Sequence, residues 1–176
     1  VLTAASGSWW SGPQDARGLP LAQSCDGTPN GWHMLSVDSQ SYRTRFVSAR
    51  EPMQMRIMLE DRRAGAAPND CLFLSRPVAS SRLGEVEIVV NIFDGGPRTQ
   101  VEACVNGCAP SAMRREMRPD PMTRDLFARA GETRKPWVQA EPSSHLWAGA
   151  LPTEIAPGVH RLTVKARNEY GETITG

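Results

Sequence analysis

The sequence lacks the patterns that mark membrane and nucleic-acid-binding proteins. It contains no uninterrupted apolar run of about 18 residues, so it predicts no membrane-spanning helix. Its 20 Lys and Arg residues nearly balance its 19 Asp and Glu residues, for a net charge of +1, and the basic residues are scattered along the chain. Because a nucleic-acid-binding face needs a clustered excess of basic residues, we expect no nucleic-acid partner.

Metal-binding and catalytic motifs are also missing. None of the 3 histidines has the H-x-H, H-E-x-x-H or D-x-H spacing that directs two ligands at one ion: they are His33, His145 and His160. Residues 94–99, DGGPRT, are too short for a phosphate-binding loop and contain proline where a backbone donor is needed. Two serines precede His145, but no G-x-S-x-G turn exposes either hydroxyl. We therefore predict no metal or catalytic residue, and an enzyme centred on His145 is the alternative.

Cysteine is scarce, with 4 residues and no C-x-x-C pair to favour zinc. Cys104 and Cys108 flank an Asn-Gly dipeptide that favours a tight hairpin turn, which would place them opposite each other. The spacing is compatible with a disulfide between these two residues, with Cys25 and Cys71 as the second pair. Free thiols are the other outcome.

The patterns that are present are those of β-strands. Polar and apolar residues alternate on both sides of the segment VDSQS, which predicts a hairpin over residues 31–49. Residues 53–59 alternate in the same way and predict a half-buried strand. Two further strands, in 85–96 and 99–107, are expected to be neighbours, and residues 159–175 predict a last pair around the turn NEYG.

One short helix is predicted after residue 119. Asp120 is a suitable N-cap, Pro121 suits the first helical position, and Gly131 suits the C-terminal cap. Early strands, one helical insertion and late strands predict an all-β fold: an antiparallel β-sandwich with an immunoglobulin- or fibronectin-III-like half and an additional N-terminal hairpin. We expect one domain over residues 1–176, with sub-parts 1–60 and 84–176 joined by a loop at 61–83.

Tryptophan is the one residue type that points to binding. Flat aromatic faces on a sandwich suit carbohydrate rings, so a sugar-binding or cell-surface adhesion module is one hypothesis. The other is that these rings plug the core or face another domain, as large buried rings commonly do. The 5 tryptophans are Trp9, Trp10, Trp32, Trp137 and Trp147.

Several segments in this order resemble one family. They are SGSWWSGPQDARGLPLAQSCDGTPNGWHMLSVD, VVNIFDGGPRTQVE, MRRE followed by RPDP, TRKPWVQAEPSSHLWAGALP and PGVHRLTVKARNEYG. Together they resemble the C-terminal domain of bacterial calcineurin-like metallophosphoesterases, from about Ser6 to Gly171. The family's D-x-H, G-D, G-N-H and G-H-x-H motifs, which hold two metal ions in its catalytic domain, do not occur in this sequence.

The resemblance implies a non-catalytic accessory domain of a periplasmic or secreted phosphoric ester hydrolase. Such a domain needs no cofactor of its own, whereas the parent's catalytic domain would hold two divalent metal ions. Its partner would be that catalytic domain, and the sandwich would pack on it and shape substrate access. The chain starts at Val1 and reads as the interior of a longer protein. The candidate interface or substrate-edge residues are Trp9, Trp10, Asp26, Asn30, Trp32, Trp137, His145 and Trp147.

Overall fold

The computed structural model describes residues 14–20, 23–49, 53–62, 71–72, 77–130 and 135–176. Strands make up 47% of the structure and helices 11%, and all three sheets are antiparallel. The predicted all-β, sandwich-like fold is therefore confirmed. None of the helices in the described ranges is long and apolar enough to cross a membrane.

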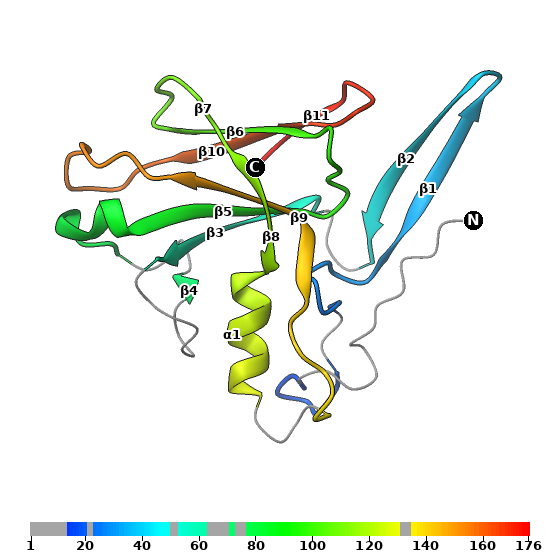
Figure 1. The fold of residues 1–176 in the computed structure, drawn as a ribbon, viewed down its shortest axis with the longest axis horizontal. Helices are drawn as coiled ribbons and strands as arrows, with labels where there is room; N and C mark the ends of the chain where they lie inside the picture. The colour runs from blue at the N-terminus through cyan, green and yellow to red at the C-terminus, as the bar shows by residue number, and fades with distance from the viewer. Residues whose placement is uncertain (1–13, 21–22, 50–52, 63–70, 73–76, 131–134) are drawn as a thin grey trace.

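The larger sheet has five strands in the order β4-β3-β5-β9-β8 (Figure 1). They are β3 (Met55–Asp61), β4 (Cys71–Leu72), β5 (Val86–Ile92), β8 (Arg114–Pro119) and β9 (Pro142–Ala150). The central strand β5 is a run of mostly β-branched residues that is buried along nearly its whole length, as expected where a sheet is covered on both faces. A short 3₁₀ helix, η1 (Ser80–Glu85), leads into it.

The smaller sheet has four strands in the order β11-β10-β6-β7. They are β6 (Gln100–Val105), β7 (Ser111–Ala112), β10 (Leu162–Arg167) and β11 (Thr173–Thr175). The chain crosses from this sheet to the larger one between β7 and β8 (Figure 1). The prediction that residues 85–96 and 99–107 form neighbouring strands is wrong, because β5 pairs with β3 and β9 whereas β6 pairs with β10 and β7.

The main core lies between the two sheets, where β-branched and small side chains interdigitate. It contains Leu59, Val86, Ile88, Val90, Ile92, Val101, Ala103, Trp147, Val164 and Ala166. A second cluster on the other face of the larger sheet joins Met58, Val89 and Leu146 to Met122 of the helix. The helix therefore covers the face that the smaller sheet leaves open.

Helix α1 (Pro121–Arg129) begins as predicted. The Asp120 side chain accepts a hydrogen bond from the backbone N–H of Thr123, and Pro121 occupies the first turn. The helix ends at Arg129 with Ala130 as its C-cap, and the predicted cap Gly131 lies outside the described residues. This N-terminus points Asp120 back into the fold, where the residue is fully buried.

The predicted N-terminal hairpin is confirmed as β1 (Gly31–Asp38) and β2 (Ser41–Ser48), which pair only with each other. It projects from the side of the sandwich as a separate two-stranded ribbon (Figure 1), and we call it the arm. Isolated hairpins are marginally stable in water, so the arm depends on what holds its base and on what covers its faces.

Both predicted disulfides are absent from the described residues, since Cys25, Cys104 and Cys108 are free cysteines. The Asn-Gly turn does form, with φ values of 56° and 72°. It closes from the Cys108 N–H to the Val105 carbonyl, and the β6–β7 register pairs Ala103 with Ser111, so Cys104 does not lie opposite Cys108. The prediction was wrong about register rather than about the turn.

Candidate functional site

The loop from Gln23 to Pro29 packs on the end of the larger sheet. Its ends pair through an isolated bridge, and the Asp26 side chain accepts the backbone N–H of Thr28 at 2.9 Å. Gly27 has φ +91°, and a Cβ added there would approach the side chains of Asn91 and Asp120 to 2.7 Å. Only glycine therefore fits at this point, because the backbone conformation and the close packing both exclude a side chain.

His145 of β9 connects this loop to the sheet. Its Nδ1 lies 2.7 Å from Asn91 Oδ1, and its Nε2 lies 3.1 Å from Asp26 Oδ2 and 3.2 Å from Thr28 Oγ1. Asn91 Nδ2 donates elsewhere, so its Oδ1 faces the ring as an acceptor. Both ring nitrogens of His145 therefore lie within hydrogen-bonding distance of side-chain oxygens.

The network continues from Asn91 to the buried cap of α1. Asn91 Nδ2 donates to Asp120 Oδ2 at 2.7 Å and to the Asp26 carbonyl at 3.3 Å. Arg56 Nη1 lies 3.6 Å from the same Asp120 oxygen and donates to the Gly27 carbonyl at 3.0 Å. One partly buried cluster therefore joins the loop, β3, β5, β9 and α1, and we call it the loop network: Asp26, Arg56, Asn91, Asp120 and His145.

The loop network strongly perturbs the Asp26 carboxyl group. Partial burial alone would raise its pKa, but the hydrogen bonds from His145 and from Thr28 outweigh that effect and lower the pKa to about 2. The neighbouring thiol responds in the opposite direction, because burial and the charges of Glu141 and Asp26 raise the pKa of Cys25. Asp26 is thus held as an anion, and Cys25 as a thiol, across the physiological range.

The base of the arm is fixed by Asp94, in the loop after β5. Asp94 Oδ1 lies 2.9 Å from His33 Nε2, and Oδ2 accepts the Phe46 backbone N–H at 3.0 Å. The rings of His33, Phe46 and Phe93 stack edge to face in sequence, with centroids 5.5 and 6.0 Å apart. The guanidinium of Arg56 lies 5.5 Å from the Phe93 centroid, so the arm base connects directly to the loop network.

Beyond this base, the arm exposes large apolar side chains on both faces. The register places Trp32 and Met34 on one face and Leu35, Val37 and Tyr42 on the other. Trp32 is 52% exposed, Val37 72% and Tyr42 65%. Contiguous exposed apolar surface of this kind marks an interaction site more often than it marks a free surface.

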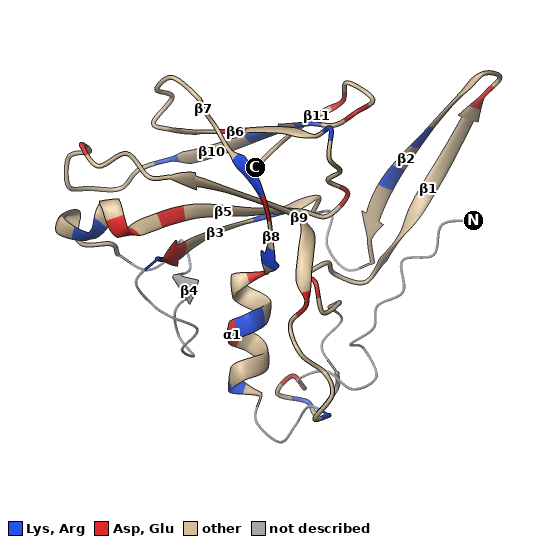
Figure 2. Cartoon of the chain, viewed as in Figure 1, with Lys and Arg blue, Asp and Glu red and all other residues tan. Residues whose placement is uncertain are grey.

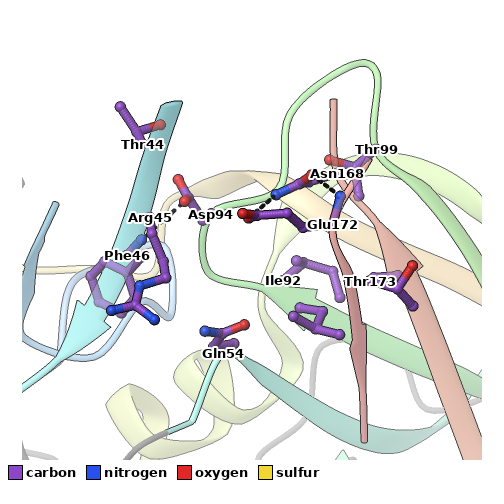
Figure 3. A pocket seen from close by; sticks show the side chains of 12 residues that line it. Thr44, Arg45, Phe46, Gln54, Ile92, Asp94, Thr99, Asn168, Glu172 and Thr173 are labelled. Carbon is purple, nitrogen blue, oxygen red and sulfur yellow. Dashed lines mark hydrogen bonds between the residues drawn. The ribbon is translucent and has the colours of Figure 1, made fainter. Parts of the chain in front are cut away.

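A cavity of about 250 Å³ lies where the arm meets the sandwich (Figure 3). Its walls carry Thr44 and Arg45 from the arm and Asn168 and Glu172 from the turn between β10 and β11. Asp94 in this cavity is already bound to the arm, and Glu172 accepts a hydrogen bond from Asn168 at 3.2 Å. The polar groups of the cavity therefore serve mainly to hold the arm against the sandwich.

A comparison with protein families decides where the chain belongs. The model of the C-terminal part of calcineurin-like phosphoesterases matches residues 1–174. The chain belongs to this family. No curated protein and no solved structure matches it significantly.

This phosphoesterase C-terminal domain shows no metal site in the part of the chain that the structure describes. Proteins of the parent class use metal ions in their catalytic domain, which this chain does not contain. In the described ranges, no group of three His, Cys, Asp or Glu side chains is arranged to hold an ion. His145 and Asp26 lie 3.1 Å apart, and both bind within the loop network. The described residues do not fit a metal ion.

The structure brings together some of the predicted site residues of the phosphoesterase domain and separates others. Asp26 and His145 bind each other directly. Trp32 lies exposed on the arm and Trp137, 73% exposed, on the loop after α1, so these two exposed rings come from separate elements. Trp9 and Trp10 lie outside the described residues.

Of two other predicted residues, Trp147 lies in the interior and Asn30 is half-buried. Trp147 is 2% exposed because β9 turns it toward the core between the sheets, where Gly95 packs against the ring, so the prediction that it lies at an edge is wrong. Asn30 has a buried side-chain oxygen with no hydrogen-bond partner among the described residues.

The sequence did not identify three members of the loop network, Asn91, Asp120 and Arg56, or the arm-base residue Asp94. The one available signal was Asn91, a lone amide inside the apolar run VVNIF. A polar residue in a strand that is buried on both faces needs a hydrogen-bond partner, which predicts a buried network but does not identify its members.

Proposed function

We propose that this phosphoesterase C-terminal domain is a non-catalytic accessory domain that packs on the catalytic domain of its own polypeptide through the arm. In this proposal the catalytic domain hydrolyses a phosphoric ester with two divalent metal ions, and the C-terminal domain holds the arm at one side of the substrate entrance. Membership of the family supports the existence of this partner.

One observation carries the proposal: the arm is a separate two-stranded sheet with apolar side chains exposed on both faces. A ribbon of this kind gains stability when a partner covers it, because each large apolar side chain that becomes buried contributes about 1.5–3 kcal/mol. The rigid base at Asp94 supports the same role, since an arm that is already oriented loses less entropy when it binds.

The loop network supports a positioning role rather than catalysis. Every polar group of Asp120 and Asn91 that the structure describes is directed at the protein interior, and both residues are fully buried. Groups that satisfy one another in this way hold a loop in place. A catalytic group must instead reach a substrate.

Activity assays on two chains test the catalytic half of the proposal. This chain and the longer polypeptide with its catalytic domain would be assayed in parallel on phosphomonoesters and phosphodiesters with added manganese or zinc. We expect turnover by the longer polypeptide alone. Metal-dependent turnover by this chain would contradict the proposal and would direct attention to His145 and Asp26.

Variants of the arm test the docking half. In the longer polypeptide, Trp32→Ser with Val37→Ser is expected to release the domain, so that limited proteolysis cuts between the two domains faster. Val159→Ser is the control, because Val159 is the most exposed large apolar residue among those that the structure describes and lies outside the arm. Equal cleavage rates for the arm variant and the control would exclude the arm as the docking element.

A further inference from the structure

A hollow of about 790 Å³ lies beside the smaller sheet and shares Thr99 and Thr173 with the cavity where the arm meets the sandwich. It is bordered by β6, β10 and β11 of that sheet and by the start of β8 from the larger sheet, at the crossing between the two. The Trp147 ring lines part of the hollow, and residues of the strands form most of its walls. Because its walls are strands rather than loops, the positions of its side chains are well defined.

Three cations face this hollow from the two sheets: Arg115 from β8, and Lys165 and Arg167 from β10. Figure 2 shows the basic positions on these strands. Glu102 is the one carboxylate that lines the hollow, so its net charge is positive. The charge is concentrated here although the whole chain carries a net charge of only +1.

The cations of the hollow have no carboxylate partners among the described residues. Glu102 is the cross-strand partner of Lys165, yet the described part of the chain contains no ion pair between them or from Arg167. Arg115 donates through Nε to the Ser144 carbonyl at 2.8 Å and has no ion pair among the described residues. Seven arginines elsewhere each contact a carboxylate: Arg17, Arg82, Arg98, Arg114, Arg118, Arg124 and Arg129.

The arrangement fits an extended anion better than a single one. Lys165 and Arg167 are two residues apart on one strand, so their Cα atoms are about 6.7 Å apart and their side chains leave the same face. Gln100, Thr99 and Thr173 add neutral polar groups along the same wall. Cations at this spacing engage two successive anionic groups of one ligand, with Arg supplying a planar pair of donors and Lys a point charge.

We propose that this hollow binds a soluble ligand with two or more phosphate groups in a row, a linear diphosphate or triphosphate. Such a ligand supplies closely spaced negative charges, which the three cations do not receive from carboxylates of the described residues. The three cations of the hollow belong neither to the arm nor to the loop network, although the hollow shares Thr99 and Thr173 with the cavity beside the arm. In the full protein, the site would retain a phosphorylated ligand close to the polypeptide that carries the phosphoesterase domain.

Calorimetric titration with sodium tripolyphosphate tests this site, with orthophosphate and sulfate at matched ionic strength as comparisons. The test variant is Lys165→Gln with Arg167→Gln. The matched control is Lys135→Gln with Arg161→Gln, which removes one exposed lysine and one exposed arginine outside the hollow. Both pairs change the net charge equally, so a difference between them reports on the site rather than on total charge.

We expect saturable binding of tripolyphosphate, weaker binding of orthophosphate, and a loss of about tenfold or more in affinity in the test variant. The control should stay within about twofold of the original chain, since isolated exposed charges are screened. If the test variant does not fold, Arg115→Gln replaces it under the same criterion. Absence of saturable binding to the original chain, or equal losses in test and control variants, would overturn the proposal.

Discussion

Replacement of Asp26 by Asn tests the loop network directly. The pKa of Asp26 falls from 3.8 to about 2 in the folded chain, because the hydrogen bonds of His145 and Thr28 outweigh the opposing effect of burial. Folding therefore favours the carboxylate. This stabilisation is fully present above pH 3.8 and disappears as the pH falls through about 2, since the unfolded chain takes up the proton first.

The size of this effect follows from the same values. The difference between 3.8 and about 2 corresponds to at most about 2.4 kcal/mol at neutral pH. The Asp26 side chain is 36% exposed, so solvent screening reduces this figure, and we expect a loss of about 1 kcal/mol in the Asp26→Asn variant. The variant should also lose stability less steeply between pH 4 and 2 than the original chain does.

Urea unfolding near neutral pH, repeated at intervals down to about pH 2, measures both the loss of stability at neutral pH and its dependence on pH. Asp38→Asn is the control, because Asp38 is an exposed residue at the tip of the arm and should leave the free energy of unfolding unchanged. If Asp26→Asn matches the original chain near neutral pH and loses stability with the same dependence on pH between 4 and 2, the Asp26 carboxylate does not stabilise the fold, which would refute this prediction.

Four further predictions concern particular side chains. Gly27→Ala should lower the free energy of unfolding by about 2–4 kcal/mol, measured by urea unfolding, because a positive φ and a 2.7 Å approach to Asn91 and Asp120 oppose the new Cβ. Asn91→Leu should lower it by about 2–4 kcal/mol, since a buried acceptor on Asp120 loses its donor. Val37→Ser should change the free energy of unfolding by less than about 0.5 kcal/mol in this chain, because the Val37 side chain is exposed. Thiol titration without denaturant should find Cys104 and Cys108 reduced and reactive.

Local signals predicted the parts of the fold that neighbouring residues determine. The Asp120 cap followed by Pro121 predicted where the helix begins, because both residues act on the first turn. The alternation on both sides of VDSQS predicted the arm. Sheet order was not predictable in this way, since the turn after β5 leads into the other sheet and no local signal distinguishes that from a hairpin.

The loop network was only partly predictable, for a similar reason. The loop's turn residues identified Asp26 as a candidate, and His145 was a second candidate from the family resemblance. Their contact joins positions 119 residues apart, and Asn91 lies 65 residues from Asp26. No sequence spacing encodes such pairings, because they arise only when three strands and a loop come together in the folded chain.

The most direct test of the central claim is hydroxyl-radical footprinting of this chain and of the longer polypeptide with its catalytic domain. Met34 lies on the arm, 47% exposed, and Met117 on β8, 70% exposed, so the two methionines are a matched pair. The account predicts that Met34 and Trp32 become protected from oxidation in the longer polypeptide while Met117 stays reactive. Equal oxidation of Met34 in both chains would contradict docking through the arm.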